Sequence, residues 1–142
     1  MRFLVMHFGY ESQADQDAMR VLRVRGRKSG RLYDVPVRIA TMNGRRYFMS
    51  MLGDAPWVGN VRRADTVELI ANRAAETFRV HEIEGEERIS FWDWYCRHPQ
   101  YAARARSALS ADVEHLSLAE LERLGHMYPV FRLEPILLAY GS

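Results

Sequence analysis

The part of the sequence best suited to chemistry is a short basic turn. Residues 26–30 place Arg27, Lys28 and Ser29 between two glycines, and Lys28 is the only lysine of the chain. Two cationic side chains and a hydroxyl supply donors for an anion, and a glycine-bounded turn can present backbone N–H groups to a phosphate. The run is no P-loop, because it lacks the Gly-x4-Gly-Lys-Ser/Thr spacing and no helix pattern follows it. A solvated basic hairpin tip is the alternative interpretation.

Other kinds of catalytic centre find little support. The 5 His and 1 Cys of the chain show no pair at metal-ligand spacing, so we expect no metal site. Ser29 does not lie in a Gly-x-Ser-x-Gly elbow, so a hydrolase triad is not expected. Cys96 stands alone, which excludes an internal disulfide framework and fits a reducing compartment.

Length and composition favour one globular domain over residues 1–142. The chain is 48% hydrophobic and 27% charged, which is ordinary for a globular protein. It has no apolar run that could span a bilayer and no cleavage-site pattern near its start, so we expect a cytoplasmic protein without a transmembrane segment. Basic residues are concentrated between positions 20 and 31, so a nucleic-acid-binding module is an alternative, although a less favoured one.

Alternating apolar and polar residues predict the strands that must hold the turn. The period of two covers residues 19–25, 35–41, 46–50, 67–71, 78–80 and 130–133, and the last of these strands is expected to continue past Pro135. Asn43-Gly44 stands between two of these runs and predicts a type I′ hairpin. Pro36 suggests an edge strand or the entrance of a strand. Six strands, mainly antiparallel, are therefore expected.

The remaining segments read as helices. Asp54 followed by Pro56 predicts an N-cap and first turn of a short helix that reaches residue 63. Apolar spacings of three and four predict helices over 86–97 and 101–109. Ser117 and Glu120 form a capping box for a last helix that Gly125 should end. The helices precede the last strand instead of alternating with strands, which indicates an α+β fold and not a βαβ sheet.

These motifs, taken in order, are similar to those of the deazaflavin-dependent nitroreductase family. The resemblance covers residues 19–135 and rests on the turn 26–30, Pro36, the run 43–47, Ser50, Gly53, Trp57-x-x-Asn60, the run 84–88 and the ending 128–135. It implies a split β-barrel related to the FMN-binding, pyridoxamine-oxidase-like fold with a helical insertion before the last strand. It also implies an enzyme that uses coenzyme F420 to reduce quinones, nitro compounds or other unsaturated small molecules. An FMN- or haem-binding split barrel is the alternative.

The resemblance also implies site residues. Arg27, Lys28 and Ser29 would hold the phosphate of the cofactor, Pro36 would line its path, Ser50 and the backbone near Gly53 would approach the deazaflavin ring, and Trp57 and Asn60 would complete the pocket.

Two segments depart from the family pattern. Many relatives have Gly-x-Pro-Arg after the lysine motif, whereas this chain has Gly30-Arg31-Leu32-Tyr33, and Arg31 or Arg38 could replace the lost arginine. In the helical insertion only Tyr101 matches a family tyrosine near the substrate, and Arg104 occupies a later tyrosine position. We therefore expect Tyr101 to position or protonate the acceptor, and some insertion aromatics to line a pocket for an unsaturated carbonyl or quinone-like acceptor.

Overall fold

The computed structural model describes residues 19–50, 53–109 and 115–136. In chain order the elements are β1 (Met19–Arg25), β2 (Leu32–Met42), β3 (Arg45–Met49), α3 (Pro56–Arg63), β4 (Thr66–Ala71), β5 (Ala74–Glu82), α4 (Gly85–Arg97), α5 (Ala102–Leu109), α6 (Leu118–Met127) and β6 (Val130–Pro135). Helices α4, α5 and α6 thus stand directly before the last strand, as the sequence predicted. The expected continuation of this strand past Pro135 is wrong within the described residues.

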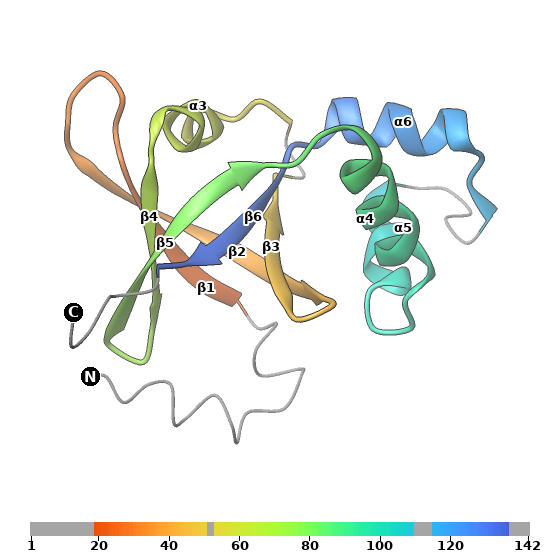
Figure 1. Cartoon of the computed structure of the whole chain (residues 1–142), viewed down its shortest axis with the longest axis horizontal. Coiled ribbons are helices and arrows are strands. Elements are labelled where there is room, and N and C mark those ends of the chain that lie inside the picture. The colour runs from red at the N-terminus through yellow and green to blue at the C-terminus, as the bar shows by residue number, and fades with distance from the viewer. Residues whose placement is uncertain (1–18, 51–52, 110–114, 137–142) are drawn as a thin grey trace.

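The six strands close into an antiparallel barrel in the order β1-β2-β3-β6-β5-β4 (Figure 1). Two tight turns set the register. Asn43 and Gly44 have φ values of 53° and 77°, the positive φ pair that the predicted hairpin requires, and Asn72 and Arg73 connect β4 to β5 with φ values of 50° and 68°. The predicted split-barrel fold with six strands is confirmed.

Side chains on both faces of several strands are buried, one face inside the barrel and the other outside it. Ile39, Phe48 and Phe131 point into the barrel core, while the neighbouring Tyr47 and Val130 belong to a second core outside it. Successive side chains of a strand point to opposite faces, so each of these strands contributes to both cores.

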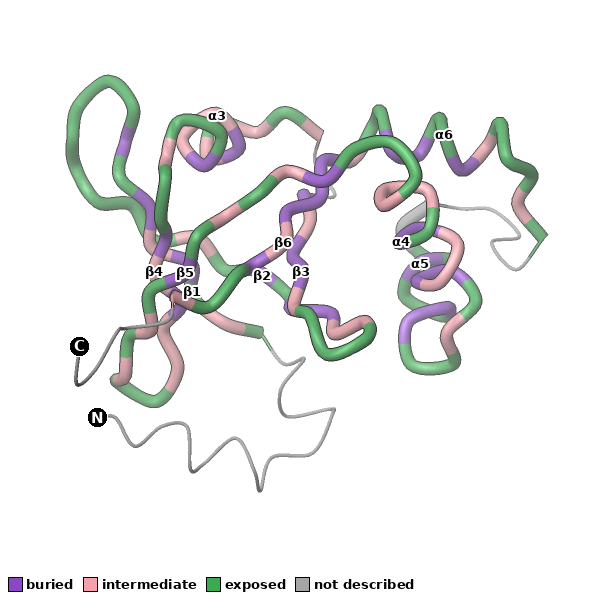
Figure 2. Tube along the Cα trace, in the orientation of Figure 1, coloured by how far each residue is buried: buried purple, intermediate pink, exposed green. Residues whose placement is uncertain are grey.

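Helices α4, α5 and α6 gather on the side of the barrel where β3 and β6 lie, and α3 sits near one end of the barrel (Figures 1 and 2). The second core fills the space between the three helices and the barrel. The helical insertion is therefore anchored by its own apolar face. Over the part of the chain that the structure describes, no helix is long and apolar enough to cross a membrane.

Helix ends confirm one sequence prediction and correct two. The capping box is present, with Glu120 N–H donating to the Ser117 hydroxyl and the Glu120 carboxylate accepting from Ser117 N–H. Asp54 is not the N-cap of α3. Ala55 takes that position without a side-chain cap, and the Asp54 carboxylate binds Arg62 instead. Gly125 does not end α6, which runs on to Met127.

Helix packing explains the glycine at position 125, and strand pairing shows where Pro36 lies. A Cβ on Gly125 would lie 2.6 Å from Nε of Arg88, so this glycine serves close contact between α6 and α4 and does not act as a stop. Pro36 lies inside β2 opposite Val21, and the barrel is closed, so the predicted edge or entrance position is wrong. An antiparallel ladder needs no N–H at its non-hydrogen-bonded positions, which is how a proline can lie within a strand.

Candidate functional site

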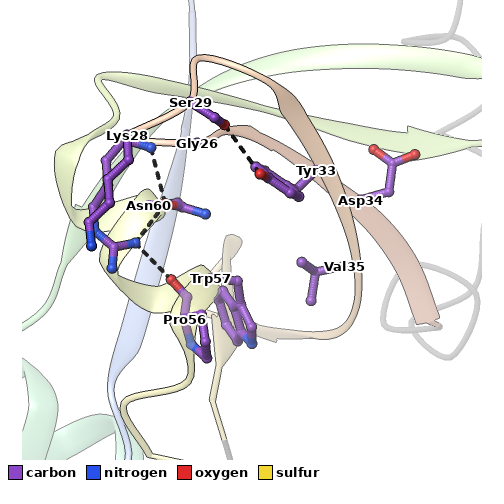
Figure 3. A pocket seen from close by; sticks show the side chains of 10 residues that line it. Gly26, Lys28, Ser29, Tyr33, Asp34, Val35, Pro56, Trp57 and Asn60 are labelled. Atoms are coloured by element: carbon purple, nitrogen blue, oxygen red, sulfur yellow. Dashed lines mark hydrogen bonds between the residues drawn. The ribbon is translucent and has the colours of Figure 1, made fainter.

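The basic turn, α3 and the start of β2 enclose a cavity of about 460 Å³ (Figure 3). Its lining residues are Gly26, Arg27, Lys28, Ser29, Tyr33, Asp34, Val35, Pro56, Trp57 and Asn60. The structure thus brings together five of the residues predicted for the cofactor, Arg27, Lys28, Ser29, Trp57 and Asn60.

Hydrogen bonds take up the amides at both ends of the turn. Gly26 N–H donates to Arg31 C=O, Gly30 N–H donates to Gly26 C=O, and Arg31 N–H, just after the turn, donates to the Ser29 hydroxyl. The expectation that the glycine-bounded turn exposes free N–H groups is therefore wrong for Gly26 and Gly30. Glycine is needed at position 26 because a Cβ there would lie 2.5 Å from the Tyr33 ring, and at position 30 because φ is +74°.

Arg27 fastens the turn to α3. Its backbone N–H and its Nη1 both donate to Oδ1 of Asn60, at 3.1 and 2.7 Å, and Nη1 also donates to the Pro56 carbonyl at 3.0 Å. The guanidinium lies close over Gly59, where a Cβ would come within 2.7 Å of Cζ. Arg27 and Asn60 thus hold the cavity wall in place, and the charge of Arg27 contributes to the cavity from this fixed position.

Lys28 is, like Arg27, an exposed cation of the turn. Within the described residues, no carboxylate forms an ion pair with it, so its ammonium is available to an anion in the cavity. Asp34 also lines the cavity, but Arg23 binds its carboxylate at 2.7 Å and holds the pKa of Asp34 below its usual value. The negative charge of Asp34 is therefore already paired.

Tyr33 takes the place of the missing family arginine in the cavity wall. Its hydroxyl lies 3.2 Å from the Ser29 hydroxyl, so two hydroxyl groups face the cavity side by side (Figure 3). Neither Arg31 nor Arg38 lines this cavity, and Arg38 belongs to the second cavity described next. The predicted compensation by one of these arginines is therefore not seen at the basic turn.

A second cavity of about 360 Å³ shares Trp57 with the first as a lining residue. It is lined by Met19, Pro36, Val37, Arg38, Met49, Ser50, Trp57, Tyr95, Arg104 and Ala105. Pro36 and Ser50, predicted to lie along the cofactor and near its ring, are both here. The indole of Trp57 also contacts the Phe48 ring of the barrel core at 6.1 Å between centroids, so it links the site to the barrel.

Ser50 and Gly53 act as a pair, although only Ser50 lines the cavity. The Ser50 hydroxyl donates to Gly53 C=O at 2.7 Å, and Ser50 N–H donates to Pro129 C=O at 3.0 Å. Ser50 is 2% exposed, so its orientation is fixed from both sides. Gly53 has a φ of +70°, which is the structural reason for a glycine there. The predicted close approach of the Gly53 backbone to a ring remains a prediction.

Tyr95 brings a hydroxyl to the second cavity between two arginines. Burial raises the pKa of Tyr95 above its usual value, while a hydrogen bond from Arg104 and the charges of Arg104 and Arg38 act in the opposite direction. The hydroxyl therefore keeps its proton at neutral pH and can donate it. In the sequence, Tyr95 is only one of several aromatics of the helical insertion, because its spacing along the helix is typical of a core residue.

Tyr101, predicted to be catalytic, lies behind Tyr95 and not at a cavity wall. It is 1% exposed, and its ring stacks on that of Tyr95 with 4.9 Å between centroids and 9° between planes. Trp94 and His98 also contact it. This geometry fits a residue that positions Tyr95. The catalytic role predicted for Tyr101 remains a prediction.

Most insertion aromatics serve packing. Phe91 and Trp92 are fully buried between α4, α6 and the barrel, and neither lines one of the two cavities. Of the insertion residues, Tyr95 and Arg104 line the second cavity, so the prediction that some of these aromatics line a pocket holds for Tyr95. No group of three or more potential metal ligands occurs among the described residues.

Solved structures similar to this chain share its fold. A Listeria innocua protein assigned as a pyridoxamine 5'-phosphate oxidase is 12% identical, with a TM-score of 0.56 over 94% of this chain and 92% of its own. HutZ, the haem storage protein of Vibrio cholerae, is 12% identical, with a TM-score of 0.54 over 97% of this chain and 93% of its own. These likenesses show the split-barrel fold alone.

The solved structure of an F420-H2 dependent reductase, FDR-A, is 23% identical over 82% of this chain and 93% of its own, with a TM-score of 0.48. No curated protein matches the chain. The family model described as F420H(2)-dependent quinone reductase matches residues 5–111, which is well over half of the chain. This chain therefore belongs to the F420H2-dependent quinone reductase family.

Proposed function

We propose that this chain binds coenzyme F420 across the two cavities and uses its reduced form to reduce a small, flat, unsaturated acceptor such as a quinone or a nitro compound. One observation carries the proposal. Two cavities share Trp57 in their walls, one with Lys28, Arg27 and the hydroxyls of Ser29 and Tyr33, and the other with Ser50, two arginines and several apolar side chains. A cofactor with a phosphate at one end and a flat ring at the other needs this combination.

The donor set fits such a cofactor. Lys28, the fixed guanidinium of Arg27 and the hydroxyls of Ser29 and Tyr33 would hold the phosphate, each by a charge-assisted hydrogen bond. Pro36, Met49 and Trp57 offer apolar surface to a ring, and Ser50 offers a hydroxyl of fixed orientation. Tyr33 donates a weaker hydrogen bond than a guanidinium would. We therefore expect the phosphate to depend on Lys28 more than it does where an arginine is present.

The protein needs no nucleophile or metal for this chemistry. When bound, a reduced deazaflavin supplies a hydride to an electron-poor acceptor. The chain's own residues then hold the two partners, exclude water with apolar walls and provide a proton. The Tyr95 hydroxyl is protonated at neutral pH and lines the cavity, and Arg104 beside it supports negative charge that develops on an acceptor oxygen.

FMN is the second candidate cofactor, because proteins of the same fold bind flavins and an FMN phosphate would meet the same turn. Haem is less favoured, since no histidine or cysteine lines either of the two cavities within the described residues. The cytoplasmic location expected from the sequence stays a prediction.

Single-turnover kinetics test the proposed activity. The protein is loaded with reduced F420 and mixed anaerobically with menadione or with a nitroaromatic compound, and the return of oxidised-cofactor absorbance is followed. We expect oxidation much faster than in the absence of protein, with a rate that saturates with acceptor concentration. Rates equal to those of free reduced F420 for every acceptor would contradict the proposal.

A further inference from the structure

Among the described residues, the side chains that line the second cavity include two positive charges and no negative one. Arg38 and Arg104 line it, and its other lining side chains are neutral. Within the described residues neither guanidinium forms an ion pair with a carboxylate. Several other arginines do, namely Arg23, Arg45, Arg46, Arg62, Arg97 and Arg132. Arg38 and Arg104 differ from the other arginines without an ion pair because both line this one cavity, which gives it room for an anion between them.

The two arginines reach the second cavity from different elements. Arg38 comes from β2 and Arg104 from α5, and Tyr95 on α4 lines the same cavity. Two like charges at one cavity repel each other, and the exposure of both side chains to water weakens this repulsion without removing it. An anion between them would remove this repulsion, and the Tyr95 hydroxyl would add a third donor.

The remaining wall restricts what the anion can be attached to. Pro36, Val37, Met49 and Ala105 are apolar, and Trp57 offers its indole. Such walls favour a flat, apolar body. Guanidinium groups match carboxylates in shape and bind them through paired hydrogen bonds. The phosphate donors of this site lie in the other cavity, at Lys28 and Ser29.

We infer that the acceptor of this protein is a flat unsaturated compound that carries a carboxylate, which Arg38 and Arg104 bind together at the second cavity. The inference rests on the proposed function, because it names the substrate class of the same site. The carboxylate serves only for recognition by the protein and is not altered in the reaction. A neutral acceptor of equal shape would leave both guanidinium groups without a counter-charge, so it should bind more weakly.

Calorimetric titration with two probes tests the inference on cofactor-free protein. The probes are naphthoate and its methyl ester, which share a flat body but differ in charge. We expect naphthoate to bind at least tenfold more tightly than the ester, in line with hydrogen bonds to a charged group. Arg38→Gln and Arg104→Gln should each weaken naphthoate binding about tenfold and leave the ester unchanged. Arg104→Lys should keep part of the preference, because it keeps the charge but not the planar fork.

Arg63→Gln serves as a matched control. Arg63 is an exposed arginine at the end of α3 that lines neither cavity, so its loss should not alter binding of either probe. Circular dichroism and the unfolding midpoint of each variant show that the fold is kept.

Two results would overturn the inference. Equal affinity for naphthoate and its ester is one. The other is a preference that survives both glutamine variants, and if those variants also weaken the binding of reduced F420, the arginines serve the cofactor instead. Failure of the proposed function looks different, since F420 would not bind the parent protein at all while naphthoate would still distinguish the variants.

Discussion

Replacement of Asn60 by alanine should release the basic turn from α3. The side chain accepts two hydrogen bonds from Arg27, a neutral one from the backbone N–H at 3.1 Å and a charge-assisted one from Nη1 at 2.7 Å. A neutral bond contributes about 1 kcal/mol and a charge-assisted one about 1.5–3 kcal/mol, and the exposed position of this pair favours the lower values. We expect Asn60→Ala to lower the free energy of unfolding by about 2 kcal/mol, measured by urea denaturation.

Two further variants isolate the contact. Asn60→Asp keeps both acceptor positions, so its stability should stay within about 0.5 kcal/mol of the parent, while its added negative charge should weaken the binding of an anion nearby. In a double-mutant cycle, Asn60→Ala and Arg27→Met should show a coupling free energy of about 1–2 kcal/mol. Arg63→Gln, on the same helix, controls for loss of an exposed arginine.

The hydrogen bonds between Arg27 and Asn60 should also affect cofactor affinity. If release leaves the turn in its binding conformation about one tenth of the time, apparent affinity for F420 falls about tenfold. The reasoning is refuted if Asn60→Ala unfolds at the same urea concentration as the parent, or if the cycle is additive. Either result would mean that Arg27 and Asn60 meet without holding the turn.

Three other predictions concern the helical insertion. Tyr95→Phe should slow single-turnover oxidation of bound reduced F420 more than Tyr101→Phe does, with cofactor affinity nearly intact in both, because only Tyr95 lies at the cavity wall. The buried thiol of Cys96, whose pKa burial and then Asp93 raise to about 11, should resist iodoacetamide at pH 8 until the protein unfolds. Because the thiol has its ordinary pKa of 9.0 once the chain is unfolded, stability should fall as pH rises through 9 toward 11. Ser117→Ala should lower stability by about 1 kcal/mol in thermal or urea unfolding, because it removes the cap of α6.

Each of these has a result that contradicts it. A larger kinetic loss in Tyr101→Phe would return the catalytic role to the residue first predicted from the sequence. Rapid alkylation of Cys96 in the folded protein would show that the thiol is not buried as described. A Ser117→Ala variant as stable as the parent would mean that the last helix does not depend on its capping box.

The barrel could be predicted from the sequence because its signals are local. Asn43-Gly44 requires a tight turn wherever it lies, and alternation from Met19 to Arg25 identifies a strand without knowledge of its partners. The capping box at Ser117 is equally local, since both partners lie within four residues.

The parts that failed depend on contacts between distant residues. Gly125 looks like a helix stop until Arg88 is seen to need its space, and Asp54 looks like a cap until Arg62 binds it. Pro36 looks like an edge residue because nothing local reveals that the barrel closes.

The candidate site, too, could be predicted from the sequence only in part. The composition of the basic turn indicated an anion site, but only the fold shows that Arg27 fastens the turn to Asn60 and that Lys28 is left for the ligand. Tyr95 and Tyr101 are six residues apart with similar surroundings in the sequence, and only packing places one at a cavity and the other behind it. Spacing in the sequence can identify such residues as candidates, but it cannot show which of them lies at the cavity.

Parallel fluorescence titrations with F420 and FMN, on the parent protein and on Lys28→Ala, test the central claim most directly. The account predicts that F420 binds at least tenfold more tightly than FMN. It also predicts that loss of the Lys28 ammonium weakens F420 binding by about 1.5–3 kcal/mol, roughly tenfold to 150-fold, with the urea midpoint unchanged. No binding of F420, equal affinity for the two cofactors, or an affinity for F420 that does not depend on Lys28 would contradict it.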